Sequence, residues 1–253
     1  MIDLRLGDCF ELFKDIPAQS VDFICTDMPY GVTKAPWDCK VDLSALWTEI
    51  KRVLKPAGVC AMFGSGKFAY ELAFSNFDWF RYRYCWFKGD CVTGFLNAKR
   101  RPLVASEDIL IFSAKQGTYN QQRRLPKGGG GSHGRIYIQR ACQKTNGRFY
   151  GVAPRVGSKS LDGLRCPIDV LEFAPLPTAK RINSTQKPQS VLEYLVKTYS
   201  NEGDLVLDPF MGSGSCGIAC LNTCRNFIGF ERDAAFYHAA QEWLAKELKQ
   251  NAE

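Results

Sequence analysis

One segment of the sequence, LDPFMGSGS at residues 207–215, limits the possible folds more than any other. An apolar strand ends there in a turn that contains Gly212 and Gly214, and a helix begins directly after the turn. Glycines allow a ligand to approach the backbone, and a helix N-terminus favours negative charge. A second apolar run, NFIGF at 226–230, follows and ends in Glu231. An acid at that position can bind the two hydroxyls of a ribose, so the arrangement predicts a site for an adenosine-type cofactor.

Predicted strands and helices alternate along the rest of the chain. Apolar runs predict strands at 21–26, 59–63 and 108–113, and an alternating pattern predicts another at 81–88. Helical spacing of apolar residues predicts helices at 43–54, 67–74, 190–199 and 234–248. This alternation indicates an α/β fold with a mostly parallel sheet, in which ligands bind at the carboxyl ends of the strands.

A second strand end carries a group of polar and aromatic residues, TDMPYG at 26–31. The Asp27 carboxylate and neighbouring backbone carbonyls can accept hydrogen bonds from an exocyclic amine. The ring of Tyr30 can stack on a planar base. A plain turn is the alternative, but the pairing of this segment with the glycine turn favours a functional site.

Positive charge is concentrated in the middle of the chain. Residues 115–187 contain fourteen Lys and Arg against three acids, a balance of +11. The rest of the chain has nineteen basic and twenty-three acidic residues, a balance of −4. Such a segment on a near-neutral body indicates a polyanionic partner, although a solvated insertion without a partner is the alternative.

Composition excludes several classes of protein. Hydrophobic residues make up 45% of the 253 residues, which excludes global disorder, and no apolar run reaches the ~20 residues of a membrane span. The N-terminus lacks the pattern of a secretory signal, and eleven scattered cysteines fit a cytoplasmic protein with reduced thiols. Cys216, Cys220 and Cys224 are interpreted as packing residues, and no metal is expected. A phosphate loop at 64–67 is rejected because its pattern is incomplete.

Along the chain, the segment at 27–30 comes first, the basic middle follows, and the glycine turn at 208–214 comes last. These segments and their order resemble the β class of amino-methylating DNA methyltransferases. DMPY at 27–30 is similar to the D-P-P-Y motif, with Met28 in place of the first proline. TQKP at 185–188 and DPFMGSG at 208–214 resemble two further segments of the family. The resemblance covers nearly the whole chain, from Gly7 to Trp243. Position 27 carries Asp, which resembles the adenine-N6 enzymes of the family, whereas the cytosine-N4 enzymes more often carry Ser there.

The resemblance implies a Rossmann-like methyltransferase fold, with a mostly parallel seven-stranded sheet flanked by helices and an inserted basic target-recognition region. It implies a catalytic half at 1–114, the insertion at 115–182 and a cofactor-binding half at 183–253. The implied cofactor is S-adenosylmethionine. Its expected binding residues are Asp8, Cys9, Lys187, Asp208, Phe210, Gly212, Ser213, Gly214, Ser215 and Glu231.

The same resemblance implies site-specific methylation of the N6 amine of a flipped-out adenine in double-stranded DNA. The expected catalytic residues are Asp27, Met28, Pro29 and Tyr30. Candidate DNA contacts are Lys34, Trp37, Arg123, Arg124, Lys127, Arg135, Arg140 and Lys144. A homodimer is considered. Methylation of cytosine N4, RNA or a protein amide, and a catalytically silent DNA-binding protein, are the alternatives.

Overall fold

The computed structural model describes residues 1–31, 38–125, 164–177, 182 and 186–250. The chain divides into two compact units, one formed by Met1–Asn120 and Asp169–Glu253 and the other by Gln121–Ile168. The domain boundaries expected from the sequence stay a prediction. Within the described ranges, no helix is both long and apolar enough to cross a bilayer.

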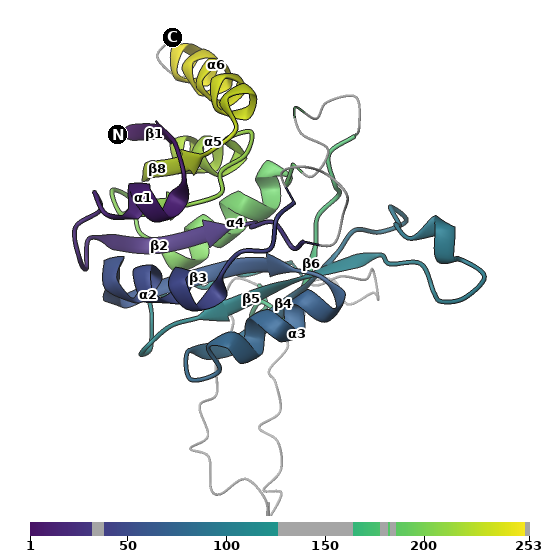
Figure 1. The fold of residues 1–253 in the computed structure, drawn as a ribbon. Coiled ribbons are helices and arrows are strands. Elements are labelled where there is room, and N and C mark those ends of the chain that lie inside the picture. The colour runs from purple at the N-terminus through teal and green to yellow at the C-terminus, as the bar shows by residue number, and fades with distance from the viewer. Residues whose placement is uncertain (32–37, 126–163, 178–181, 183–185, 251–253) are drawn as a thin grey trace, which may run out of the picture. The chain divides into compact units, whose positions relative to one another are not determined.

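The first unit is built on one eight-stranded sheet (Figure 1). Its strands lie in the order β1 (Ile2–Leu6), β8 (Asn226–Glu231), β7 (Leu205–Asp208), β2 (Val21–Thr26), β3 (Leu54–Gly64), β5 (Ser106–Phe112), β4 (Phe80–Phe87) and β6 (Val170–Glu172). Neighbouring strands are parallel except at β5, which is antiparallel to both β3 and β4. The other seven strands therefore end at the same edge of the sheet, and β5 begins there.

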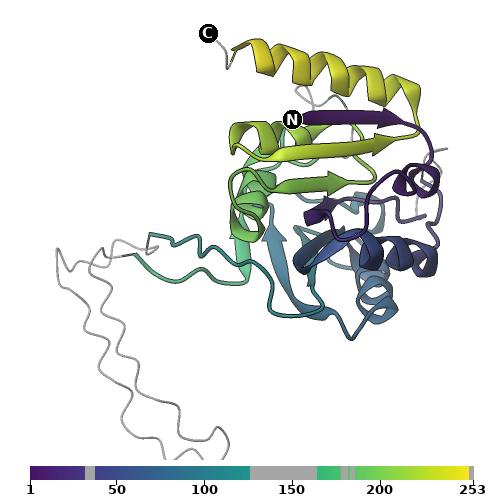
Figure 2. The same ribbon diagram turned by 90° about the vertical axis from the view of Figure 1, so that its left-hand side faces the viewer.

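Helices cover both faces of the sheet, as Figures 1 and 2 show. One face is covered by α1 (Cys9–Phe13), α2 (Leu43–Val53) and α3 (Gly66–Ser75), the other by α4 (Gln189–Tyr199), α5 (Ser215–Asn222) and α6 (Ala234–Gln250). Alternate residues of β2 point to opposite cores: Phe23 and Cys25 pack with the second set of helices, and Ile24 packs with the first. The central strands are thus buried on both faces, which explains their continuous apolar runs.

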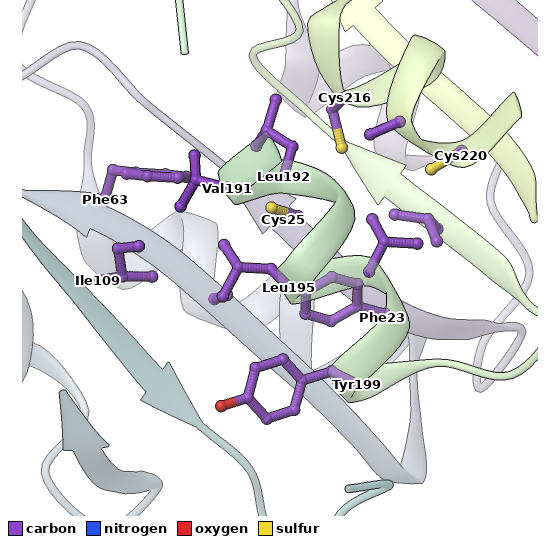
Figure 3. Close-up of a cluster of buried hydrophobic side chains, with 14 of the residues drawn as sticks. Phe23, Cys25, Phe63, Ile109, Val191, Leu192, Leu195, Tyr199, Cys216 and Cys220 are labelled. Atoms are coloured by element: carbon purple, nitrogen blue, oxygen red, sulfur yellow. The ribbon is translucent and has the colours of Figure 1, made fainter. Parts of the chain in front are cut away.

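The core beneath α4 contains three thiols. Two of them, Cys216 and Cys220, were expected to be packing residues, and the third, Cys25, had no expected role. Figure 3 shows Cys25, Cys216 and Cys220 in the same cluster of buried side chains as Phe23 and Leu195. All three cysteines are buried in this apolar cluster, whereas Cys224 is exposed. Cys216 and Cys220 are therefore packing residues, as expected, whereas the same interpretation is wrong for Cys224, which follows the end of α5.

The prediction of an α/β fold with a mostly parallel sheet is confirmed, but the sheet has eight strands and not the seven that the resemblance implied. Apolar patterns placed six of them, and the two that they did not place, β1 and β6, lie at the two edges of the sheet. β6 has only three residues, of which only Leu171 is buried, so no apolar run marks it in the sequence. The strand expected at 59–63 begins five residues earlier, because β3 starts at Leu54 directly after α2, and its pairing with β2 changes register over this stretch.

Candidate active site

The glycine turn joins β7 to α5 at the carboxyl edge of the sheet. Gly212 and Gly214 have left-handed φ angles of 52° and 79°. A Cβ on Gly214 would lie 2.9 Å from the Cβ of Ala240, so a side chain there would collide with α6. Gly214 is thus required both by the backbone conformation and by packing.

Asp208 closes β7 and fixes the turn from inside the protein. Its Oδ1 accepts hydrogen bonds from the Thr26 hydroxyl at 2.7 Å and from the Phe210 N–H at 3.1 Å. Burial raises the pKa of Asp208 well above its ordinary value. The carboxylate joins the end of β2 to the end of β7, which makes Asp208 a positioning residue. Direct contact with a cofactor stays a prediction.

Glu231 and Asp8 stand at the ends of the two neighbouring strands, β8 and β1. The two oxygens of Glu231 accept hydrogen bonds from the N–H groups of Gly212 at 2.9 Å and Asp233 at 2.8 Å. Asp8 caps α1 by accepting a hydrogen bond from the Phe10 N–H at 2.9 Å. Burial raises the pKa of Glu231. Backbone donors therefore hold both carboxylates in place.

The DMPY segment follows β2 at the same edge. The Tyr30 hydroxyl donates a hydrogen bond to Asp27 Oδ1 at 2.8 Å. The Tyr30 ring stacks on Phe68, with 4.5 Å between the ring centroids and 22° between the planes. Burial raises the pKa of Tyr30 well above its ordinary value, so its hydroxyl keeps its proton. Met28 is buried beneath this segment.

Lys187 was expected near the methionine end of a cofactor, and the structure places its ammonium group between two acids. It donates a hydrogen bond to Asp27 Oδ2 and lies 3.5 Å from Glu107 Oε2. Glu107 Oε1 also forms an ion pair with Lys88. Burial lowers the pKa of Lys187, but Asp27 and Glu107 outweigh it and raise that pKa overall.

Glu107 is a site residue that the sequence reasoning missed. Burial alone would raise its pKa, yet Lys187 and Lys88 hold that pKa below the ordinary value. Because β5 runs antiparallel, its first residues reach the edge where the other strands end, and Glu107 pairs there with Trp86. Two adjacent acids, Glu107 and Asp108, near the start of an otherwise apolar strand were the only available signal.

One cleft of about 630 Å³ joins these groups. Asp8 and Glu231, which follow β1 and β8, line one part of its wall, and the DMPY segment, which follows β2 two strands further along the sheet, lines another. These two parts are called the cofactor end and the catalytic end. Cys39, Phe236 and Arg232 are among further lining residues. Of the expected residues, those on the cleft wall are Asp8, Cys9, Asp27, Met28, Pro29, Tyr30, Lys187, Phe210, Gly212 and Glu231. Ser213 and Ser215 line a smaller adjoining cavity with Asp208 and Asp27. Two segments predicted from separate strand ends therefore form one site.

The expected DNA contacts are only partly described. Arg123 donates a hydrogen bond to the Leu164 carbonyl at 3.0 Å, and Arg124 to the Cys166 carbonyl at 3.2 Å. These bonds and the isolated bridge between Arg124 and Arg165 join two segments of the second unit. The other expected contacts lie outside the described residues: Lys34, Trp37, Lys127, Arg135, Arg140 and Lys144.

Comparison with models of protein families shows the family to which this chain belongs. The model of the N6_N4_Mtase family, described as DNA methylase, matches residues 21–242. The chain belongs to this DNA methylase family. The match spans both the DMPY segment and the glycine turn, and the expectation of a DNA methyltransferase is confirmed.

Three known proteins illustrate the similarity of this DNA methylase to others. The Escherichia coli K12 protein named DNA adenine methyltransferase YhdJ is 30% identical over 277 residues, which cover 96% of this chain and 86% of that protein. The crystal structure of the M1.HpyAVI–SAM complex matches with a TM-score of 0.64 at 24% identity, over 96% of this chain and 99% of that chain. The PvuII DNA methyltransferase, described as cytosine-N4-specific, matches with a TM-score of 0.66 at 15% identity, over 95% and 85%. The expected methyltransferase fold is therefore confirmed.

Proposed function

We propose that this DNA methylase transfers a methyl group from S-adenosylmethionine to the N6 amine of adenine in double-stranded DNA. The observation that carries the proposal is the single cleft, which has Glu231 and Asp8 at one end and Asp27 and Tyr30 at the other. The fold alone does not separate adenine from cytosine enzymes, because a cytosine-N4 enzyme shares it. The choice of adenine is supported by Asp27 itself and by the relative named as an adenine methyltransferase.

The residues at the first end of the cleft fit a nucleoside cofactor. Glu231 uses one hydrogen bond for each oxygen, and a carboxylate has about four acceptor positions, so it can also accept bonds from two ribose hydroxyls. Asp8 and Cys9 line the same wall, where an adenine ring would lie, and Phe236 adds an aromatic surface. A cleft of this size is ordinary for a ligand of that class. When bound, S-adenosylmethionine supplies an electrophilic methyl group.

The residues at the second end fit a flipped base with an exocyclic amine. Tyr30 packs on Phe68 and lines the cleft, so its ring is fixed before a base arrives to stack on it. Asp27 Oδ1 and Oδ2 each keep acceptor capacity beside their bonds to Tyr30 and Lys187. Together with the Met28 carbonyl, Asp27 would accept hydrogen bonds from the two N–H groups of the amine, which orients the nitrogen lone pair for attack on the methyl group. The nitrogen loses one proton when it is methylated, and the Asp27 carboxylate is placed to accept that proton. Positioning and fixed charges supply the acceleration.

Lys187 and Glu107, which also line the cleft, support the position of Asp27. The Lys187 ammonium is buried, with 8% of the residue exposed, and it orients Asp27 through a charge-assisted hydrogen bond. Glu107 lies beside Lys187 and forms an ion pair with Lys88, so the two lysines and the two acids of this group balance in charge. Both residues act through Asp27 and are therefore positioning residues in this mechanism.

The proposal is tested by identifying the methylated product. DNA incubated with the protein and S-adenosylmethionine carrying a deuterated methyl group is digested to nucleosides and analysed by mass spectrometry. Labelled N6-methyldeoxyadenosine is the expected product. Labelled N4-methyldeoxycytidine, or label found only in RNA or protein, would contradict the proposal. A homodimer and a cytoplasmic location stay predictions of the sequence.

A further inference from the structure

The segment between β4 and β5 forms an arm beside the cleft. Residues 88–105 are closed at the base by backbone hydrogen bonds, from Lys88 N–H to the Ala105 carbonyl at 2.8 Å and between Thr93 and Val104 at 2.9 and 3.0 Å. β4 ends and β5 begins at the edge where β2 ends, so the arm leaves the sheet on the side of Asp27. Figure 1 shows it projecting beyond the ends of the strands. Lys88 and Thr93, at its base, line the cleft.

The tip of the arm carries apolar side chains that the fold does not use. Gly94, in a left-handed conformation, starts a single 3-10 turn, η1 (Phe95–Asn97). Leu96 is fully exposed, at 101%, and Phe95 is 67% exposed. Neither belongs to either hydrophobic core of the described residues. Two adjacent apolar side chains held out on a stem indicate a contact with another molecule rather than a role in folding.

Positive charge follows directly after these apolar residues. Lys99, Arg100 and Arg101 are consecutive and all exposed, and within the described part of the chain no hydrogen bond or ion pair engages their side chains. Asp90 is the only acid between residues 89 and 105. The tip thus combines apolar side chains with unpaired cations, which is the composition of elements that contact phosphates and insert between bases.

We propose that residues 94–103 are a DNA-contacting element separate from the basic segment at 115–182. Lys99, Arg100 and Arg101 bind phosphates next to the target site. Leu96 enters the duplex at the step from which the target base leaves and occupies the space that the base vacates. This inference rests on the proposed function, because a base that stays in the stack leaves no space to fill. The charge of the tip favours DNA over a second copy of the chain as its partner.

The cationic part is tested with a double charge reversal, Arg100→Glu with Arg101→Glu. The matched control is Lys246→Glu with Lys249→Glu, because both lysines are exposed on α6 and the change in net charge is the same. Affinity for a fluorescent duplex, of a sequence that the wild-type protein methylates, is measured by anisotropy at several salt concentrations. The arm variant should lose at least about tenfold in affinity, and its slope of log affinity against log salt should fall by about 2. Equal effects in the two variants would overturn the proposal.

The apolar part is tested with Leu96→Ala against Leu248→Ala, a partly exposed leucine on α6. The target adenine is replaced by 2-aminopurine, whose fluorescence rises when the base leaves the stack. Leu96→Ala should reduce that rise by at least about half at saturating protein, and Leu248→Ala should leave it unchanged. An unchanged rise in Leu96→Ala would overturn the assignment of Leu96.

Two further measurements separate the possible failures. Calorimetric affinity for S-adenosylmethionine and the melting temperature should be unchanged in the arm variants, which shows that the cleft and the fold are intact. Light scattering should give all variants the mass of the wild type, whereas a lower mass in the arm variants would make the tip an interface between copies and overturn the proposal. If the wild-type protein methylates DNA and the arm variants bind DNA normally, the arm proposal fails alone. If the wild type transfers no methyl group to DNA, the proposed function fails instead.

Discussion

At one end of the cleft, backbone N–H groups hold the carboxylates of Glu231 and Asp8, whereas at the other end lysine side chains pair with those of Asp27 and Glu107. The difference changes how the acids titrate. Burial raises the pKa of Glu231, but Lys187 and Lys88 overcome burial and lower the pKa of Glu107. Glu231 at the cofactor end therefore takes up its proton at a higher pH than Glu107 at the catalytic end, which depends on its buried cations.

The largest effect is expected at the catalytic end, called the lysine-held end because Lys187 and Lys88 pair with its acids. Lys187→Met leaves Asp27 without its cation and Glu107 with only Lys88, so the free energy of unfolding should fall by about 3 kcal/mol. This value is at the lower limit for a buried pair, because Asp27 keeps some contact with solvent. Urea denaturation measures the change.

Two companion variants sharpen this result. Lys197→Met removes an exposed ion pair with Glu193 on α4 and should cost less than about 0.5 kcal/mol. Adding Glu107→Gln to Lys187→Met should restore at least about 1 kcal/mol, because one uncompensated charge is removed. A loss in Lys187→Met no larger than in Lys197→Met would show that the lysine-held end is not a buried charge cluster.

The second effect concerns the ring at the catalytic end. Tyr30→Ala should weaken binding of a duplex with its target base flipped by roughly 1–3 kcal/mol, the range of base–aromatic stacking. Tyr30→Trp should keep part of the activity because a flat ring remains. Tyr30→Phe retains the stacking surface and loses only the hydrogen bond to Asp27, so its cost should be about 1 kcal/mol. Single-turnover rates and duplex affinities compare the three variants, and equal losses in Ala and Phe would rule out stacking.

The smallest effect concerns the backbone-held end and its dependence on pH. Glu231 must be ionised to accept bonds from both ribose hydroxyls, and its pKa is raised above the ordinary 4.5. Affinity for S-adenosylmethionine should therefore fall as pH is lowered through that raised pKa, over a range in which Glu107 stays ionised. Glu231→Gln should cost about 1.5 kcal/mol at neutral pH and abolish this pH dependence. Calorimetry at several pH values measures it, and an unchanged pH profile in the variant would assign the titration to another group.

The backbone-held end could be predicted from the sequence because its geometry is local. The glycine turn, the helix after it and Glu231 lie within 25 residues and are joined by short connections. The position of the DMPY segment also followed from one rule, that parallel strands end at the same edge.

The lysine-held end could not be predicted because its partners come from distant parts of the chain. Glu107 reaches Lys187 only because β5 is inserted antiparallel between β3 and β4. Apolar periodicity gives the existence of a strand but not its direction, so the pairing of Asp27, Lys187 and Glu107 had no local signal. The edge strands β1 and β6 were missed for a related reason, since half-buried edges lack continuous apolar runs.

In the proposed mechanism, one end of the cleft binds the cofactor and the other end transfers its methyl group. The most direct measurement compares Asp27→Ala with Glu231→Gln, using calorimetric affinity for S-adenosylmethionine and the single-turnover transfer rate to DNA at saturating cofactor. Asp27→Ala should keep its affinity within about twofold and lose at least about a hundredfold in rate, because its role is in the transition state. Glu231→Gln should lose about tenfold in affinity and keep most of its rate at saturation. Loss of both properties in both variants, or full transfer by Asp27→Ala, would contradict the account.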